Sequence, residues 1–552
     1  MTGLGLAFGA AFTALVLVLT GCSATPTGEP RLPPTAEQQL DQIILEYADS
    51  RQTGASGPDQ SAGAHRQAIQ AKRDLLERLH RIPVTGLSPA AAIDHRVLSG
   101  LLESSIHTDG IRRVWENQPA LYLPASGISR ALESVRQDAS AENLESLNQV
   151  LGRLELTFDH ARRNLKRPPR FFTDSAIFQA EQTLAALQTF SAERPGLASV
   201  EDAVSRLELF LAFLREDLLP RSDSSWALGK PGYDFILRHR WHMDDDADSI
   251  LARGLQAFED TEALAREVAD RIQPGADWIT VYETLKDDHP PADGIKAAYQ
   301  SQMDAAQIFV LENRILTLPA GERVVTLDTP PAMRRLSPFG TFDGVDPLGD
   351  ELEGRLLLTP IEDWLETEAR RQRLRSHHNA WVPVIAVHEA YPGHHAHALK
   401  IRENPRLLRK IVREPIFSEG WGLYTEELMF ELGFLQGDAV RLTQLRNRLW
   451  RAARVILDVQ LHTGQISFEE AVDFLVEKVR FERYAAELEV GMYIRRPTYV
   501  LGYLIGMQEI IAIREAYTRK FGEPDPPSAF FDKLLSAGSI PPALVKRELL
   551  AE

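Results

Sequence analysis

The sequence predicts a mainly α-helical protein with a small β-sheet between an N-terminal and a C-terminal helical portion. From about residue 36 onward, long segments repeat apolar residues at intervals of three and four, as amphipathic helices do. Strand-like segments, by contrast, are few. The chain has 552 residues, of which 44% are hydrophobic, and it shows no fixed-period repeat. We therefore expect one large protein with a substantial core rather than three or four independent domains.

The first 22 residues predict an export signal. Residues 1–21 carry no charged side chain, and their apolar run is too short and too rich in glycine for a comfortable membrane span. The run ends in LTGC, which resembles a bacterial lipobox, although no Lys or Arg precedes it. We predict a lipoprotein signal over 1–22 with lipidation at Cys22. The alternative is an ordinary signal peptide in which this cysteine is incidental.

The rest of the chain divides into a tether and two helical portions. Residues 23–36 are rich in Pro, Thr and Gly, which is typical of a flexible tether. A soft boundary near 273–293 separates an N-terminal helical portion, 37–290, from a C-terminal portion, 291–552. Lipidation would hold this body at a membrane surface outside the cytoplasm. The predicted location is therefore the cell envelope, on a periplasmic or other extracytoplasmic face.

Individual elements can be predicted along both portions. Ser199 and the acidic triplet 244–246 are plausible N-caps. In 314–328, two β-branched runs flank Pro-Ala-Gly-Glu, which predicts a hairpin, and RLLLT at 355–359 predicts a further strand. The clearest amphipathic helical segments are 37–50, 141–165, 200–219 and 247–271.

Charge and cysteine content exclude several classes of protein. The 61 basic and 78 acidic residues give a net charge of −17, which argues against a nucleic-acid partner because such binding needs a basic surface. The single cysteine excludes an intramolecular disulfide framework, a cysteine-rich zinc ribbon and a cysteine-ligated iron–sulfur cluster. A metal site in this chain must therefore rely on histidine and carboxylate ligands.

The segment VIAVHEAYPGHHAHALK contains the first candidate metal ligands. An apolar run leads into His388-Glu389, so this pair is expected on a buried helix. Zinc peptidases commonly carry His-Glu-x-x-His, which puts both histidines on one helix face. Here Pro392 takes the place of the second histidine, and the next histidines are His394 and His395.

A straight helix would not bring these histidines together. His394 would be rotated by about 240° from His388, and His395 would lie about 10 Å farther along the axis. Pro392-Gly393 can supply the distortion that zinc bonds of about 2 Å would require, because proline removes a helix hydrogen bond and glycine accepts unusual dihedral angles. We predict His388 and His394 as metal ligands, with His395 as the alternative to His394.

The segment FSEGWGLYTEEL supplies a third candidate ligand. Its Glu-Gly-Trp-Gly-x-Tyr-x-Glu pattern resembles the third-ligand helix of gluzincin metallopeptidases, in which the glutamate before Gly-aromatic binds zinc, and Glu419 has this position. Glu426 would either orient a ligand side chain without binding the metal itself, or be an acidic residue exposed to solvent on its helix. Two imidazoles and one carboxylate leave a coordination position open for water, as in a catalytic zinc site. Glu389 adjoins His388 and is the predicted general base.

Two more segments contain candidate catalytic side chains. In LWRAARVILDVQLHTG, Arg454, Asp458 and His462 recur every four residues and so share one helix face. They form either a structural network between helices or part of the site, where Arg454 or His462 would bind a substrate carboxylate or an oxyanion and Asp458 would orient its neighbours. In YIRRPTYVLGYLIG, Tyr499 and Tyr503 would donate to an oxyanion or simply be core aromatics.

Together, HEAYPGHH, EGWGLYTEEL, the RxxxDxxxH spacing and RRPTYVLGYLIG resemble the bacterial family catalogued as domain of unknown function 885. The resemblance covers roughly residues 36–550 and is strongest over 380–540. It implies kinship with gluzincin-related, zincin-like peptidases. The expected architecture is therefore that of a two-lobed, mainly helical metallopeptidase with a deep channel and a small β-sheet beside the active-site helix.

The resemblance also implies roles for particular residues. It implies transition-state roles for His462 and Tyr503, and a substrate contact that differs at His397, where relatives often have glutamine. The metal and base positions that it implies are His388, Glu389, His394 and Glu419.

These observations predict a zinc-dependent peptidase that holds one Zn²⁺ per chain and cleaves short peptides in the cell envelope. An intact Glu389 favours an enzyme, because a purely structural metal site needs no base. Two alternatives stay open: a non-enzymatic envelope lipoprotein that keeps a metal site for binding or stability, and a metal-dependent amidase that acts on non-peptide substrates. The sequence also leaves open whether the enzyme is an exopeptidase or an endopeptidase, and which oligomeric state it has.

Overall fold

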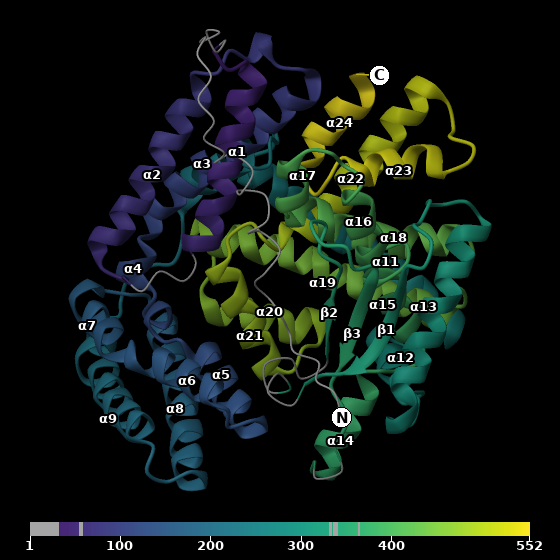
Figure 1. The fold of residues 1–552 in the computed structure, drawn as a ribbon. Helices are drawn as coiled ribbons and strands as arrows, with labels where there is room; N and C mark the ends of the chain where they lie inside the picture. Colours follow the sequence, from purple (N-terminus) through teal and green to yellow (C-terminus); the bar gives the residue numbers. More distant parts are fainter. Residues whose placement is uncertain (1–32, 55–58, 331–333, 335–339, 363–364, 552) are drawn as a thin grey trace.

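The chain is mainly helical and contains one small sheet (Figure 1), which confirms the coarse fold prediction. The predicted signal, its Cys22 and most of the tether lie outside the described residues. Among the described helices, none combines the length and the apolar character that crossing a membrane requires. The residues that the computed structural model describes are 33–54, 59–330, 334, 340–362 and 365–551.

From the first described residues to the end of α12, the regular secondary structure is helical. The segment predicted over 247–271 is α11, and Asp246 caps it by accepting a hydrogen bond from the backbone of Ser249. Ser199 is not a cap, because α9 already begins one residue earlier. The elements are α1 (Ala36–Gly54), α2 (Ala62–His80), η1 (Val84–Gly86), α3 (Pro89–Arg112), α4 (Val114–Asn117), η2 (Pro119–Tyr122), α5 (Ala125–Gln137), α6 (Ala141–Gly152), α7 (Leu154–Asn164), α8 (Arg170–Glu193), α9 (Ala198–Ala212), η3 (Phe213–Leu218), η4 (Leu219–Arg221), α10 (Gly229–His239), α11 (Ala247–Ile272) and α12 (Trp278–Leu285).

Two predicted helices differ from the structure in their continuity. The segment 141–165 is divided into α6 and α7, because the chain turns at Arg153. The segment 200–219 begins as α9 and continues into the π-helical turn η3.

The later part of the chain combines the sheet with a second set of helices. The helix α11 packs along α19, α18 packs against α22, and α13 packs against both β1 and α15. The elements are η5 (Ala292–Gly294), α13 (Ile295–Glu312), β1 (Arg323–Asp328), β2 (Gly340–Asp343), β3 (Glu353–Leu358), α14 (Thr367–Arg375), α15 (Val382–Glu389), α16 (His394–Ile401), α17 (Leu407–Ile411), α18 (Pro415–Glu431), α19 (Asp438–Thr463), α20 (Phe468–Val479), α21 (Arg483–Arg495), α22 (Leu501–Phe521), α23 (Ser528–Ser536) and α24 (Pro542–Ala551).

The sheet has the strand order β1-β3-β2. The strand β1 is parallel to β3, with Val325 opposite Arg355, whereas β2 is antiparallel to β3, with Thr341 opposite Leu357. The strand predicted from RLLLT is confirmed as part of β3. The central position of β3 leaves β2 at one edge of the sheet, where it borders the cavity described below.

The hairpin predicted over 314–328 is wrong. Only the second half of that segment forms a strand, and this strand pairs with β3. Ile315 and Leu316, in the first half, are buried in the main core instead. Their apolar character therefore reflects packing against helices and not strand pairing.

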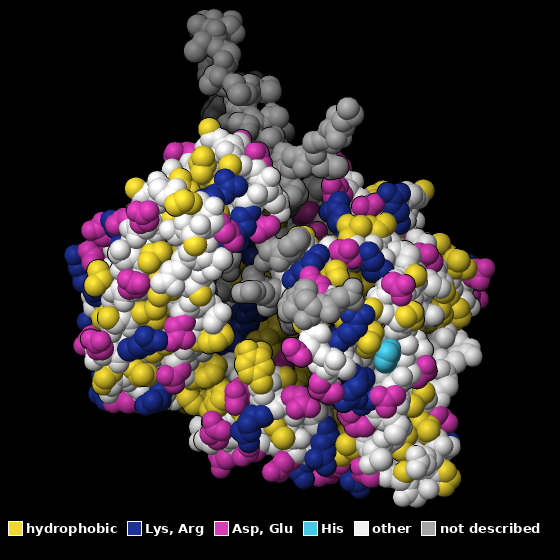
Figure 2. All heavy atoms as spheres, turned by 90° about the horizontal axis from the view of Figure 1, so that it is seen from below, with side chains coloured by type: hydrophobic (Ala, Val, Ile, Leu, Met, Phe, Trp, Pro, Cys, Tyr) yellow, Lys and Arg dark blue, Asp and Glu magenta, His cyan; other side chains and the backbone are white. Residues whose placement is uncertain are grey.

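The main hydrophobic core joins distant parts of the chain. It contains apolar residues of α1 to α3 together with those of α13, the sheet, α15 to α18 and α22 to α24. A separate core lies within η2 and α5 to η3, the group of helices at the lower left of Figure 1. Seen from below, the molecule is hollowed between this group and the rest, and basic and hydrophobic side chains lie in the hollow (Figure 2).

The backbones of α18 and α22 meet directly. A β-carbon added to Gly420 would lie 2.5 Å from the carbonyl carbon of Gly506, and one added to Gly506 would collide with the carbonyl oxygen of Ile416. Only glycine permits this approach. The position of α18, which carries Glu419, is therefore set by direct backbone contact with α22.

Candidate metal site

A break between α15 and α16 shapes the site. The first helix ends at Glu389 and the second begins at His394, with a cis peptide bond before Pro392 in the intervening segment. A β-carbon on Gly393 would collide with the carbonyl oxygen of His388, so this turn requires glycine. The indole of Trp421, on α18, donates a hydrogen bond of 2.8 Å to the carbonyl oxygen of Pro392. The break is thus tied to the helix that carries the third predicted ligand.

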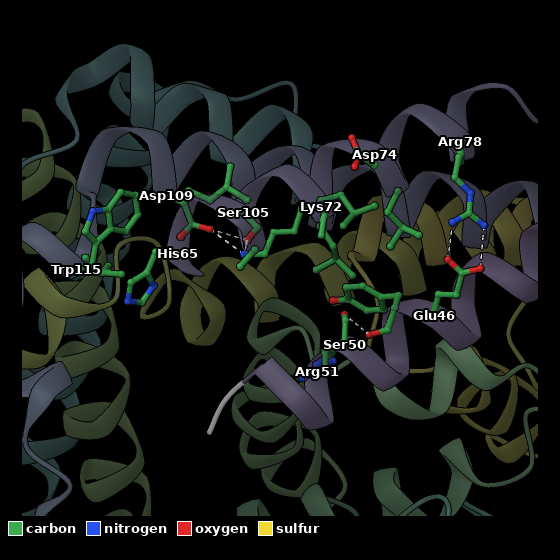
Figure 3. A pocket seen from close by; sticks show the side chains of 18 residues that line it. Glu46, Ser50, Arg51, His65, Lys72, Asp74, Arg78, Ser105, Asp109 and Trp115 are labelled. Atoms are coloured by element: carbon green, nitrogen blue, oxygen red, sulfur yellow. Dashed lines mark hydrogen bonds and ion pairs between the residues drawn. The ribbon is translucent and has the colours of Figure 1, made fainter. Parts of the chain in front are cut away.

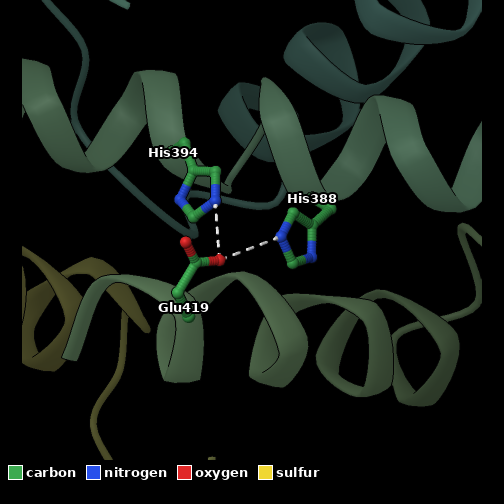
Figure 4. A group of neighbouring side chains, drawn as sticks. All are labelled: His388, His394 and Glu419. Atoms are coloured by element: carbon green, nitrogen blue, oxygen red, sulfur yellow. Dashed lines mark ion pairs between the residues drawn. The ribbon is translucent and has the colours of Figure 1, made fainter. Parts of the chain in front are cut away.

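The break brings His388 and His394 together, as the sequence predicted from Pro392-Gly393. Their ring centroids are 4.7 Å apart, and the rings are nearly perpendicular. Glu419 reaches both from α18: its Oε2 atom lies 3.8 Å from Nε2 of His388 and 3.5 Å from Nε2 of His394 (Figure 4). One ligand atom from each of the three residues lies within 4.8 Å of the others. Within the described part of the chain, no other group of histidine, cysteine or carboxylate side chains meets this condition.

His395, the alternative ligand, lies outside this cluster. It is fully buried, and its Nε2 atom is 2.9 Å from Oε2 of Glu322. The same carboxylate oxygen accepts a hydrogen bond of 2.7 Å from the hydroxyl of Tyr391. The structure therefore brings His394, rather than His395, to His388.

Glu426 contacts His388 on the side of the imidazole ring that faces away from the cluster. This glutamate is fully buried, and its Oε1 atom lies 2.8 Å from Nδ1 of His388. Burial excludes the alternative of a solvated helix acid. A β-carbon on Gly422 would lie 2.7 Å from the imidazole ring, so the ring rests directly on the backbone of α18. Contacts on both sides therefore fix the orientation of His388.

Carboxylates dominate the electrostatics of the cluster. Burial by itself would lower the pKa of His388, but the hydrogen bonds and charges of Glu419 and Glu426 outweigh it and raise the pKa to about 10. Burial likewise favours neutral Glu419, but the two histidines hold its pKa well below the usual range. Glu389 adds a third carboxylate beside His388. This surplus of negative groups around two imidazoles suits a bound cation.

The cluster opens into a cavity of about 600 Å³. Glu389 lines it beside the cluster, and within the described residues its carboxylate has no hydrogen-bond or ion-pair partner. Tyr503 and Arg454 line the same cavity. A second cavity, of about 440 Å³, adjoins the first, since Glu389 and the edge strand β2 contribute to both walls.

Of the three residues predicted to share a helix face, Arg454 lines the cavity, whereas Asp458 and His462 lie in the interior. Arg454 pairs with Glu489 at 3.1 Å and lies over the ring of Tyr503, 4.6 Å from its centroid. Asp458 and His462 are fully buried and line neither cavity.

Asp458 and His462 have partners of their own in the interior. Asp458 accepts hydrogen bonds from the hydroxyl of Tyr233 at 2.6 Å and from the backbone of Thr498 at 2.9 Å. The Nε2 atom of His462 lies 3.1 Å from the carbonyl oxygen of Tyr493. The structure thus places His462 away from the cavity, because the last turns of α19 run into the core beneath α21.

Tyr503 and Tyr499 both lie near the cluster. Tyr503 lines the cavity, and the hydroxyl of Tyr499 lies 3.5 Å from Oε1 of Glu419. Burial raises the pKa of Tyr503 well above its ordinary value, so its hydroxyl keeps its proton. His397, at a position where relatives often have glutamine, lines the same cavity. Burial lowers the pKa of His397 well below its ordinary value.

Sequence reasoning missed several cavity residues. Arg451 and Trp450 line both cavities, and Phe342 does so from β2. The only sequence signal for Arg451 is its spacing, three residues before Arg454 on one helix. Nothing local in the sequence identifies Phe342, because its strand reaches the site through tertiary packing.

A further cavity, of about 800 Å³, lies between α1, α2 and α3 (Figure 3). Four of its charged groups form two ion pairs. Arg78 donates to Glu46 at 2.5 and 2.9 Å, and Lys72 donates to Asp109 at 2.8 Å. These pairs satisfy four of the charges in the cavity, and among the described residues its side chains form no cluster that could hold a metal ion, so the metal cluster remains the better candidate site.

Comparisons with known proteins find a similar fold in bacterial structures described as candidate lipoproteins. A candidate lipoprotein of unknown function from Shewanella oneidensis is 18% identical, with a TM-score of 0.76 over 94% of this chain and 100% of that chain. A candidate lipoprotein from Colwellia psychrerythraea is 17% identical, with a TM-score of 0.72 over 94% of this chain and 99% of that chain. A comparison with curated proteins finds no match. Residues 50–549 match the family model described as "Bacterial protein of unknown function (DUF885)".

Proposed function

The chain belongs to the DUF885 family of bacterial proteins of unknown function, and we propose that it is a zinc-dependent peptidase. One observation carries the proposal. Three groups with the chemistry of zinc ligands converge within 4.8 Å in a cavity whose wall also holds the carboxylate of Glu389, which has no partner in the described part of the chain. A site that only stabilised the fold would have no use for such a carboxylate, so an enzyme is favoured over a non-enzymatic metal-binding lipoprotein.

The residues present fit zinc. Two imidazoles and one carboxylate are a common donor set for catalytic zinc, which keeps one position for water or substrate. The contact between Glu426 and His388 matches the carboxylate support that zinc-bound histidines usually have. A zinc ion held by His388, His394 and Glu419 would lower the pKa of water and polarise a carbonyl group.

The chain's own residues then supply the proton transfers. Glu389 accepts a proton from the attacking water and delivers it to the nitrogen of the leaving amine. Tyr503, which keeps its proton, donates a hydrogen bond to the carbonyl oxygen as negative charge develops there. Arg454 contacts the face of the Tyr503 ring, and its pairing with Glu489 holds both side chains in place.

The substrates are short peptides of the cell envelope. Cavities of about 600 and 440 Å³ accommodate a few residues rather than a folded protein. The envelope location rests on the lipobox-like sequence at Cys22 and agrees with the descriptions of the two similar structures as candidate lipoproteins.

The test compares the wild type with Glu389→Gln, using Glu312→Gln as the control because Glu312 is exposed on α13 and lines neither cavity. Zinc per chain and hydrolysis of a peptide library are measured for each protein. We expect about one zinc in all three and a loss of at least 100-fold in hydrolysis only for Glu389→Gln. Wild type without zinc in zinc-replete buffer would refute the site, and equal hydrolysis by Glu389→Gln would refute the role of this base.

A further inference from the structure

We infer that Arg451 binds the C-terminal carboxylate of the substrate while the adjoining aromatic cavity holds a large apolar side chain of the same terminal residue. The inference rests on the proposed peptidase function and makes it more specific. It assigns the protein to substrates that end in a free carboxylate next to a phenylalanine-like or leucine-like residue.

The first observation is that Arg451 is a buried cation that has no paired anion among the described residues. Its exposed fraction is 6%, its only hydrogen bond is a 3.4 Å contact with the carbonyl oxygen of Asn447, and its Nε atom has no partner. No carboxylate among the described residues lies within ion-pair distance, although Glu426 acts on it at longer range. An unpaired buried charge is costly, so a bound anion would stabilise this arrangement.

Three other arginines on α19 differ from Arg451 because they pair with carboxylates. Arg454 pairs with Glu489, whereas Arg441 and Arg448 pair with Glu427. Arg448 is partly buried on the same helix but lines neither cavity. On α19 the guanidinium groups without a described carboxylate partner, those of Arg446 and Arg451, therefore occur where the helix borders the cavities, and the paired Arg448 serves as a matched control.

The second observation is the position of Arg451 at the junction of the two cavities. Arg451 and Glu389 each contribute to both walls, whereas His388, His394 and Glu419 line only the first cavity. A peptide bond held between the metal cluster and Glu389 would thus have the residue beyond it at the junction. A carboxylate on that residue meets Arg451, which fits a planar carboxylate with two parallel hydrogen bonds.

The third observation is the chemistry of the second cavity. Its volume of about 440 Å³ exceeds the need of a single side chain, and most of its wall is aromatic or aliphatic. Arg446 lies over the rings of Tyr282, Trp450 and Phe481 and has no ion pair with a described carboxylate. The apolar side chains of this wall include Phe342, Leu356, Leu358, Trp381 and Ile385.

The second cavity therefore combines an apolar wall with two guanidinium groups, those of Arg446 and Arg451, that form no ion pair with a described carboxylate. Its other basic groups, Lys286 and Arg375, are already paired with Glu283. A large apolar side chain matches the wall, and a carboxylate matches Arg451. The terminal residue of a peptide carries both features on one carbon atom.

The test measures equilibrium binding of N-acetyl-phenylalanine and of its C-terminal amide, with and without zinc. We expect the acid to bind the wild type at least ten-fold more tightly than the amide. In Arg451→Met this preference should disappear, whereas Arg448→Met should retain it. Equal binding of acid and amide to the wild type would overturn the inference without any variant, and so would a preference that survives in a folded Arg451→Met.

A second arm separates this inference from the proposed function. Hydrolysis of acetyl-Ala-Phe is compared with that of its C-terminal amide. Faster cleavage of the free acid supports the inference, whereas equal cleavage overturns it and leaves the peptidase proposal standing. Selective binding of the acid together with no hydrolysis of any peptide would refute the peptidase and leave Arg451 as an anion site.

Discussion

The Nδ1 atom of His388 lies 2.8 Å from Oε1 of the fully buried Glu426, so a carboxylate holds this imidazole from the side opposite the cluster. Replacing Glu426 with glutamine keeps the shape and removes the charge. We expect zinc affinity to fall by roughly 10- to 100-fold, because carboxylate partners raise the basicity of ligand histidines. Competition with a zinc-sensitive dye measures the zinc affinity. Glu427→Gln is the control for the loss of a negative charge on α18, because Glu427 pairs with Arg441 and does not contact His388. An unchanged affinity in Glu426→Gln would contradict the role of the contact.

Gly422→Ala should disrupt the cluster without touching any ligand. The added methyl group would lie 2.7 Å from the ring of His388, closer than real contacts allow. We expect about 1–3 kcal/mol of lost stability from overpacking and a drop of at least ten-fold in zinc affinity. Gly110→Ala is the matched control, because Gly110 lies in the helix α3 with open space around it. Thermal unfolding and zinc titration measure both effects, and a Gly422→Ala protein with normal zinc affinity would refute the account.

Asp458 should make stability depend on pH. Burial raises its pKa from 3.8 to about 7, only partly offset by hydrogen bonds from Tyr233 and Thr498. Between these values the folded state keeps a proton that the unfolded chain has released, so the free energy of unfolding falls as pH rises through this window. The loss is on the order of a few kcal/mol.

Asp458→Asn tests this titration. Its amide oxygen can still accept both hydrogen bonds, but it cannot ionise. Denaturant unfolding at pH 4 to 8 should show a flatter dependence for the variant than for the wild type, with the relative stability of the variant rising from about pH 4 and levelling off near pH 7. Parallel curves for the two proteins would contradict it.

Cys22→Ser tests the lipid anchor. If the sequence LTGC is a lipobox, the wild type expressed in a bacterium incorporates labelled palmitate and sediments with membranes. The variant should lose the label and move to the soluble fraction. Equal labelling of the two proteins would show that the anchor, if there is one, is attached elsewhere.

Local sequence signals predicted much of the helical framework and the core of the candidate site. Three-and-four spacing identified α11 because its helix is long and capped by Asp246. The Pro392-Gly393 pair predicted a distortion near His394, because proline and glycine act on their own backbone. Such signals need no knowledge of distant contacts.

Features that depend on long-range packing could not be predicted in this way. Ile315 and Leu316 have the apolar pattern of a strand but pack against helices, so the hairpin prediction was wrong. His462 shares the spacing of Arg454, yet α19 carries it into the interior. The cavity role of Arg451 depends on which charges are absent around it, and spacing along one helix contains no such information.

The backbone contact between Gly420 and Gly506 has a consequence for the geometry of the site. One face of α18 rests on α22 and the opposite face supports the ring of His388 at Gly422, so the helix acts as a spacer of fixed thickness between them. A methyl group added at this interface, on the α22 side, would push the whole spacer toward the ring. The separation of the candidate ligands is therefore adjustable from the α18–α22 interface, without a change in any ligand.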